Sequence, residues 1–244
     1  MEDLHIQYPR RKVIRAILRQ LIQVAFRTLS DFIIEGKENL PKEGPLLVIG
    51  NHFSFLDPVA VIGSVPYPIE YVGGFRMPNA PQGVTWLARL YGFLPVRRGS
   101  VSRDTLYASR KVLQLKGVLG IFPEAGSWAK VLRPARPGAA YLASSTRSKI
   151  LPVGLDGLDE LFPMLKRGKR AKITIRFGEP FGPFFVSERG ETDRRRLEEI
   201  GHEMMRHIAA LIPPEKRGYY SEDHAIREAA MAETFYPWEG KPEE

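Results

Sequence analysis

The chain has 244 residues, of which 43% are apolar and 26% are charged, a composition typical of a globular protein with enough apolar material for a core. It contains no cysteine, which excludes disulfides, thiolate catalysis and cysteine-ligated metals. Lysine and arginine number 36 against 28 acidic residues, and the excess of 8 positive charges suits an anionic partner such as a nucleic acid, a phospholipid surface or a phosphorylated substrate. No apolar run reaches the roughly 18–20 residues of a membrane-spanning helix and no signal-peptide pattern opens the chain, so we expect a protein that stays inside the cell.

The first predicted element is an amphipathic helix between Arg10 and Ile34. Apolar residues recur there at helical spacing: Ile14, Ile17, Leu18, Leu21, Ile22, Ala25, Leu29, Phe32 and Ile33. Polar and mostly basic residues fall largely between them: Arg11, Lys12, Arg15, Arg19, Gln23 and Arg27. The pattern fits a helix that lies in a membrane interface, and it fits equally a helix that packs on the domain with solvated arginines.

Short apolar strands alternate with helices along the rest of the chain. Strands are predicted at 45–50, 69–73, 118–122, 149–154 and 172–177, and helices at 57–63, 84–90, 102–116, 137–145 and 192–211. This alternation predicts an α/β fold, a single domain with a central, mostly parallel mixed sheet flanked by helices. We expect an N-terminal membrane-surface segment at 1–35, the domain proper at 36–218, and a C-terminal tail at 219–244.

The segment with the clearest chemistry is Asn51-His-Phe-Ser-Phe-Leu-Asp57, directly after the first buried strand. Histidine accepts protons near neutral pH, and an aspartate on its far ring nitrogen fixes the tautomer and stabilises the imidazolium. A strand-to-helix turn can bring His52 and Asp57 together, and Pro58 in the first turn of the helix supports that boundary. As residue types alone, the two also fit a loop histidine and a helix N-cap. Between them, Ser54 is better suited to bond the turn than to act as a nucleophile.

This segment resembles the N-H-x-[ST]-x-x-D block of the lysophosphatidic acid and glycerol-3-phosphate acyltransferase family. Further blocks similar to the family's follow in its order over about residues 36 to 180: Gly92-Phe-Leu-Pro-Val-Arg-Arg98, Ile121-Phe-Pro-Glu124, Pro137-Gly-Ala-Ala-Tyr-Leu-Ala143 and Ile150-Leu-Pro152-Val-Gly. The resemblance implies that His52 and Asp57 are catalytic. It implies substrate-binding positions at Asn51, Ser54, Arg98, Glu124 and Pro152, with Arg98 on the acceptor's phosphate and Pro152 near the acyl groove.

The chain departs from the family after Glu124. The family usually continues F-P-E-G-T-R-S, whereas this chain has Phe122-Pro-Glu-Ala-Gly-Ser-Trp128, so the arginine associated with acceptor phosphate is missing. Three basic residues follow closely and are candidates to replace it: Lys130, Arg133 and Arg136. The identity of the acceptor is therefore open.

The resemblance implies a direct transfer that needs no metal and no cofactor. His52 would remove the proton of the acceptor's hydroxyl as its oxygen attacks the thioester of acyl-CoA or acyl carrier protein. The expected reaction turns 1-acylglycerol 3-phosphate into phosphatidic acid, with glycerol 3-phosphate or another lysolipid as the alternative acceptor. The expected place is the cytoplasmic face of the cell membrane, where the protein would be peripheral or monotopic on an anionic surface.

Two other classes of protein compete with this interpretation. A basic nucleic-acid-binding module would explain the charge, but the chain lacks the aromatic residues set among basic ones that a single-strand binder shows, and no nucleic-acid partner is expected. A lipid-binding relative without catalysis would explain the altered block after Glu124. A zinc site at His202, Glu203 and His207 is not expected, because a spacing of five places the two rings on different faces of a helix.

Overall fold

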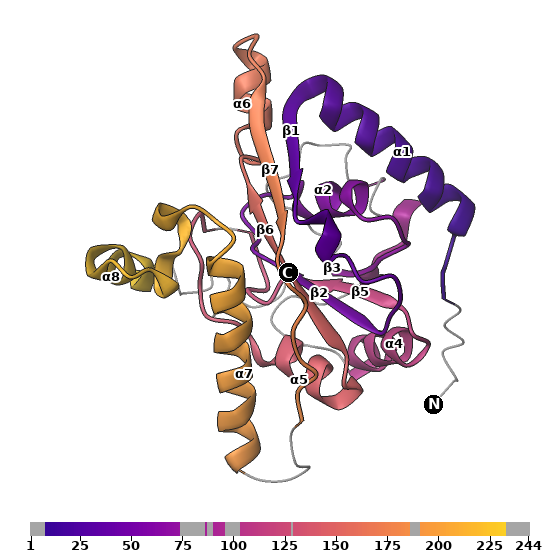
Figure 1. Ribbon diagram of the computed structural model, residues 1–244, viewed down its shortest axis with the longest axis vertical. Coiled ribbons are helices and arrows are strands. Elements are labelled where there is room, and N and C mark those ends of the chain that lie inside the picture. Colours follow the sequence, from indigo (N-terminus) through magenta and orange to yellow (C-terminus); the bar gives the residue numbers. More distant parts are fainter. Residues whose placement is uncertain are drawn as a thin grey trace, which may run out of the picture.

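The computed structural model describes residues 8–73, 86, 90–95, 103–127, 129–185 and 191–232. Within them, seven strands form a sheet in the order β1-β7-β6-β2-β5-β3-β4 (Figure 1). The strands are β1 (Ser30–Glu35), β2 (Leu46–Gly50), β3 (Glu70–Gly73), β4 (Leu94–Pro95), β5 (Val118–Ile121), β6 (Lys149–Asp156) and β7 (Ala171–Phe177). All neighbouring pairs are parallel except β6 and β7, which are antiparallel. The predicted α/β fold with a mostly parallel mixed sheet is confirmed.

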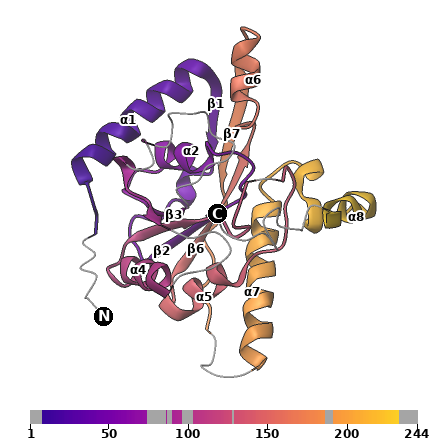
Figure 2. The same cartoon turned by 180° about the vertical axis from the view of Figure 1, so that it is seen from behind.

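Helices cover both faces of this sheet, as Figures 1 and 2 show. The described helices are α1 (Lys12–Leu29), α2 (Asp57–Ser64), α4 (Arg103–Gln114), α5 (Pro137–Thr146), α6 (Leu161–Lys166), α7 (Glu191–Ala209) and α8 (His224–Ala232), with 3-10 turns at Lys37–Asn39, Pro214–Lys216 and Gly218–Tyr220. The helix predicted at 84–90 falls almost wholly outside the described residues.

The central strand β2 shows how the core is built. All five of its residues are buried, with Leu46 and Val48 in the apolar cluster under α1 and α2, and Leu47 and Ile49 in the cluster under α5 and α7. Successive side chains of a strand point to opposite faces of the sheet, so a continuous apolar run serves a strand that is covered on both sides. This arrangement leaves the carboxyl end of β2, where Asn51 follows, at the edge of the sheet shared with β5 and β6.

The N-terminal segment differs from its prediction in its last five residues. The helix was expected to run to Ile34, but it ends at Leu29, and Ser30–Glu35 form β1, paired in parallel with β7 over the whole strand. Ser30 closes the helix by donating its hydroxyl to the carbonyl oxygen of Phe26 at 2.6 Å. Since β1 belongs to the sheet, residues 30–35 are part of the domain that was expected to begin at residue 36.

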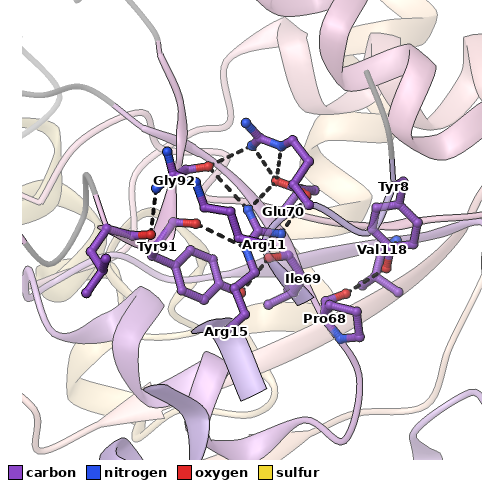
Figure 3. A network of polar contacts seen from close by, with 11 residues as sticks. Tyr8, Arg11, Arg15, Pro68, Ile69, Glu70, Tyr91, Gly92 and Val118 are labelled. Carbon is purple, nitrogen blue, oxygen red and sulfur yellow. Dashed lines mark hydrogen bonds and ion pairs between the residues drawn. The ribbon is translucent and has the colours of Figure 1, made fainter. Parts of the chain in front are cut away.

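Two arginines of α1, Arg15 and Arg19, face the domain, which was not expected. Arg15 is buried, and its guanidinium donates two hydrogen bonds to the fully buried carboxylate of Glu70 in β3, at 2.5 and 2.8 Å (Figure 3). Arg10 donates two more hydrogen bonds to Glu70, at 2.5 and 3.2 Å, and Arg11 donates to the carbonyl oxygen of Leu90 at 2.6 Å. The prediction of solvated arginines is therefore wrong for Arg15.

The outer face of α1 is apolar instead. The side chains that face solvent include Val13, Ile14, Ile17, Leu21 and Val24, and three of them, Val13, Leu21 and Val24, are 60–71% exposed. We call these five residues the outer face of α1. No helix in the described ranges has the length and hydropathy required to cross a bilayer. The helix thus packs on the domain with Arg15 and with the apolar residues Leu18, Ile22 and Phe26, and it presents further apolar side chains outward.

The C-terminal segment begins its contact with the domain before residue 219. Leu132 donates its N–H to the carbonyl oxygen of Lys216 and accepts the N–H of Tyr219, both at 3.0 Å. Tyr220 then hydrogen-bonds His202 of α7 at 2.9 Å, and α8 follows. The described part of the tail, up to residue 232, is therefore tied to the loop that precedes α5.

Candidate active site

The predicted pair forms at the turn between β2 and α2. The Nδ1 atom of His52 lies 2.9 Å from Oδ2 of Asp57, the first residue of α2. The same carboxylate oxygen accepts the backbone N–H of Ser54 at 2.8 Å, so the turn itself holds the aspartate in place. Asp57 is buried, whereas the His52 side chain is 19% exposed. Only the histidine end of the pair is open to a substrate.

The contacts of the pair determine which nitrogen can act. A carboxylate is an acceptor, so the Nδ1 atom of His52 carries the proton of the shared hydrogen bond and Nε2 is left as the basic nitrogen. Burial raises the pKa of Asp57, while the hydrogen bond and charge of His52 and the backbone N–H of Ser54 oppose that rise. The arrangement suits a general base whose positive charge is stabilised as it forms.

The ring of His52 is also held from its face. It stacks on Phe122 with a centroid separation of 4.2 Å and an interplanar angle of 15°. Phe122 stacks in turn on the buried Tyr71 of β3, at 5.7 Å and 14°. Sequence reasoning assigned no role to these aromatic residues, although Phe122 opens the F-P-E block. Nothing in the sequence around Tyr71 signals its part in the site.

Asn51 joins two strands, and its side chain is fully buried. Its side-chain amide donates to the carbonyl oxygen of Leu155 at 2.8 Å and accepts the N–H of Leu155, also at 2.8 Å, and the residue is fully buried. The side chain thus continues the pairing of β2 with β6 by one more step. The prediction of substrate binding by Asn51 is corrected: the residue positions the turn that carries His52.

Glu124 contacts the backbone of His52 and is fully buried. One carboxylate oxygen accepts the backbone N–H of His52 at 3.0 Å, and the other accepts the backbone N–H of Arg133 at 3.2 Å. Burial raises the pKa of Glu124 to about 7, against the opposing charge of Arg133 and these two hydrogen bonds. Glu124 was predicted to bind substrate, but the structure directs its oxygens to the backbone of the site.

The three basic candidates after Glu124 have different surroundings. Arg133 is buried, with Nε 3.4 Å from Glu124 and Nη2 donating to the carbonyl oxygen of Gly126, so its expected role as a phosphate ligand is corrected to an interior one. Lys130 is exposed and lies 4.0 Å from Asp159. Arg136 is exposed directly before α5.

The other predicted positions are quickly placed. The hydroxyl of Ser54 accepts the N–H of Leu56 at 3.2 Å, the local role expected for it. Pro152 is buried in β6 beside β2. Arg98 lies outside the described residues. In the described ranges no group of three or more His, Asp or Glu side chains is arranged to hold a metal, and His202 and His207 have separate partners, Tyr220 and Phe181.

Comparison with known proteins places this site in a family. Residues 31–156, just over half of the chain, match the acyltransferase family. The chain is 27% identical over 136 residues to the 1-acyl-sn-glycerol-3-phosphate acyltransferase of Borreliella burgdorferi, covering 53% of each protein. It is 28% identical over 142 residues to a chloroplastic 1-acyl-sn-glycerol-3-phosphate acyltransferase of Brassica napus, covering 55% of this chain and 40% of that one. The match thus spans about half the length of these curated relatives.

A solved structure shows the same fold. The crystal structure of the 1-acyl-sn-glycerophosphate acyltransferase PlsC from Thermotoga maritima superposes with a TM-score of 0.57 and 24% sequence identity, covering 81% of this chain and 82% of that one. The family match includes β2, the His52–Asp57 turn, β5 and Glu124. The chain belongs to the acyltransferase family.

Proposed function

We propose that this protein is an O-acyltransferase that moves a fatty acyl group from acyl-CoA or acyl carrier protein to the free hydroxyl of a lysophospholipid. The observation that carries the proposal is the His52–Asp57 pair, in which a partly exposed imidazole is oriented by a buried carboxylate at 2.9 Å. Family membership supports the same chemistry.

The geometry supports two proton transfers through one imidazole, first as a base and then as an acid. Nε2 of His52 takes the proton of the acceptor's hydroxyl while the oxygen attacks the thioester carbonyl and forms a tetrahedral intermediate. The carbon–sulfur bond then breaks, and the leaving thiolate takes the proton from the imidazolium, so the enzyme returns to its starting state. Asp57 stabilises the imidazolium in between. Glu124, Asn51 and Phe122 keep the imidazole and its backbone in place.

We favour 1-acylglycerol 3-phosphate as the acceptor and phosphatidic acid as the product. The names of the relatives support this choice, and Arg98, in its matched block, is our candidate for the phosphate. Glycerol 3-phosphate or another lysolipid is the second candidate. It is favoured by the missing family arginine and by the burial of Arg133, which leave Lys130 and Arg136 as the exposed basic side chains near Glu124.

We further propose that the enzyme works on the cytoplasmic face of an anionic membrane, as a peripheral or monotopic protein. The outer face of α1 supports this placement, because an exposed apolar stripe on an otherwise folded helix marks a surface for an apolar partner. Acceptors with long acyl chains reside in membranes, so a docked enzyme meets them where they are.

The test of the chemistry is thiol release from acyl-CoA or acyl carrier protein against a panel of lysophospholipids and glycerol 3-phosphate. We expect His52→Ala to lose at least about a thousandfold in kcat, since it removes the general base. The control is His224→Ala, an exposed histidine of α8 that should leave the rate unchanged. If His52→Ala kept a tenth of the wild-type rate, the proposed role of His52 would be wrong. If the wild-type protein released no thiol with any acceptor but bound lipid, it would be a non-catalytic relative, and binding of nucleic acid alone would favour the other class.

The test of membrane placement changes the outer face of α1 without removing the helix. Deletion would also remove the partners of Glu70 and so damage the fold. Ile17→Asp with Leu21→Asp should abolish sedimentation with anionic vesicles, because two charges would have to enter an apolar phase. Activity on a water-soluble short-chain acceptor should persist. Unchanged vesicle binding by this variant would refute the placement.

A further inference from the structure

The strongest concentration of positive charge in the chain lies far from the catalytic turn in the sequence, from the end of α6 to the start of β7. Five of the seven residues at 166–172 are lysine or arginine and none is acidic, against a net charge of +8 for the entire chain. We call this segment, residues 166–172, the basic tip. Its five charged residues are all exposed: Lys166, Arg167, Lys169, Arg170 and Lys172.

One arginine fastens the basic tip to the end of α1. Arg170 pairs with Asp31 of β1 at 2.8 Å and donates to the carbonyl oxygens of Arg27 and Thr28 at 2.9 and 2.6 Å, and also to that of Ser30. These acceptors are the last carbonyls of the helix and the start of β1. The basic tip is therefore held at a fixed place beside the C-terminal end of α1, and Figures 1 and 2 show α6 at that same end of the molecule.

The other four basic side chains of the tip do not fasten it to another element. In the part of the chain that the structure describes, the side chains of Lys166, Arg167, Lys169 and Lys172 make no ion pair with a carboxylate. A run of charge on a surface is often merely solvated. This run differs, because it is fixed next to exposed apolar side chains. These are Phe162 of α6, four residues before Lys166, and Leu29 at the end of α1, between Thr28 and Ser30, whose carbonyl oxygens Arg170 contacts; each is 41% exposed.

The outer face of α1 and the basic tip together provide the apolar part and the charged part of a contact with a bilayer. The outer face of α1 is apolar, and Arg15 of that helix is buried on Glu70, so it is not available to lipid. The basic tip supplies unpaired positive charge at the C-terminal end of the same helix. Cations close to an anionic leaflet and apolar side chains that enter it are the two terms that hold a protein at a membrane surface.

We propose that the basic tip binds the headgroups of anionic phospholipids while the outer face of α1 enters the apolar layer beneath them. The inference rests on the proposed action at a membrane and assigns its electrostatic part to a specific site. It also predicts a defined orientation of the protein on the bilayer. Arg170 fixes the basic tip to the end of α1, so both parts have to meet the membrane at the same time. Single-stranded nucleic acid is the less suitable partner, since Phe162, the aromatic residue next to the tip, stacks on Phe55 of the protein itself.

The experiment compares two variants that remove the same charge at opposite ends of the molecule. The first carries Lys166→Gln, Arg167→Gln and Lys169→Gln, and leaves Arg170 in place to preserve the tie to α1. The matched control carries Arg194→Gln, Arg195→Gln and Arg196→Gln, three exposed residues near the start of α7. Binding is measured by sedimentation with vesicles of phosphatidylcholine alone and of phosphatidylcholine with phosphatidylglycerol, at low and high salt.

We expect the tip variant to lose about a hundredfold in partition onto anionic vesicles at low salt, from about 1 kcal/mol for each of three charges. The loss should shrink at high salt and be absent on phosphatidylcholine alone. The partition of the control variant onto anionic vesicles should change by less than about threefold, since this variant tests the effect of net charge only. Equal losses in both variants, or wild-type binding by the tip variant, would overturn the inference, as would loss of binding to an RNA oligonucleotide with vesicle binding intact.

Activity in solution separates this inference from the proposed function. With a water-soluble short-chain acceptor, the tip variant should turn over like the wild-type protein, which also shows that it is folded. If the wild-type protein fails to transfer acyl groups at all, the proposed function is wrong, and the vesicle comparison still decides the role of the basic tip. If transfer is normal and the tip variant binds vesicles normally, the inference alone is wrong.

Discussion

The buried ion pair between α1 and β3 gives a stability prediction that can be worked out from its contacts. Arg15→Met removes two charge-assisted hydrogen bonds to Glu70, at 2.5 and 2.8 Å, and a bond to the carbonyl oxygen of Tyr91 at 3.0 Å. Removing one partner of a buried pair costs about 3–5 kcal/mol because the other charge stays buried. Arg10 still reaches Glu70 at 2.5 Å, so we expect the lower end, about 3 kcal/mol. For a chain of this size that corresponds to a fall of roughly 6–12 °C in Tm.

The assay is urea unfolding of the wild-type protein, Arg15→Met, Glu70→Leu and the double variant. The double variant should lose less than the sum of the single losses, by about 2 kcal/mol or more, because neither buried charge is left without its partner. Lys12→Met, an exposed charge on the same helix, is the control and should change stability by less than about 0.5 kcal/mol.

The pH dependence provides a second check on the same pair. Burial alone would raise the pKa of Glu70, but the hydrogen bonds and charges of Arg15 and Arg10 hold it below its ordinary value of 4.5. A carboxylate with a lowered pKa contributes stability above its unfolded pKa and loses it as the pH falls. The gap between the wild-type protein and Glu70→Leu should therefore narrow below about pH 4.5. A loss under about 1 kcal/mol for Arg15→Met, or strict additivity in the double variant, would refute the reasoning.

Three further predictions concern the active site. Asp57→Asn should lower kcat by about 10³–10⁴-fold with little change in fold, since the amide no longer fixes the reactive tautomer of His52; a steady-state rate within tenfold of the wild-type rate would contradict this. Arg98→Ala should raise the KM for a phosphorylated acceptor and leave the KM for acyl-CoA nearly unchanged, and Arg98→Lys should recover part of the loss; indifference to Arg98→Ala would remove the phosphate assignment. Glu124, with its pKa raised from 4.5 to about 7, should make unfolding free energy fall by up to about 3 kcal/mol as the pH rises between those values. Glu124→Gln should flatten that slope in urea titrations from pH 5 to pH 8, and an unchanged slope would assign it to another group.

Much of the fold could be predicted because most of its strands have a recognisable local sequence pattern. Residues 46–50 are a continuous apolar run, which is the pattern of a strand whose two faces are both covered. β1 could not be predicted in this way, because Phe32 and Ile33 continue the helical spacing of the residues before them. Its strand conformation depends on β7, about 140 residues further along the chain, as the pairing of Ser30 with Ala171 shows. Tertiary pairing overrode the local pattern.

In the candidate site, too, local contacts could be predicted from the sequence and long-range contacts could not. His52 and Asp57 are five positions apart, so one turn brings them together and the residue types indicate the chemistry. The roles of Asn51 and Glu124 depend on partners 104 and 72 positions away, respectively, which spacing cannot reveal. The helical pattern of α1 likewise indicated an amphipathic helix but could not tell that Arg15 meets the protein, because that depends on the buried carboxylate of Glu70.

The amide bridge between Asn51 and Leu155 makes one backbone proton a reporter for the whole turn. The N–H of Leu155 is donated to a side chain that directly precedes His52, at 2.8 Å, in a fully buried position. Its exchange with solvent deuterium therefore requires the turn between β2 and α2 to open, or the sheet to come apart. Comparing this amide with its neighbours in β6 separates local opening of the catalytic turn from global unfolding, without a substrate.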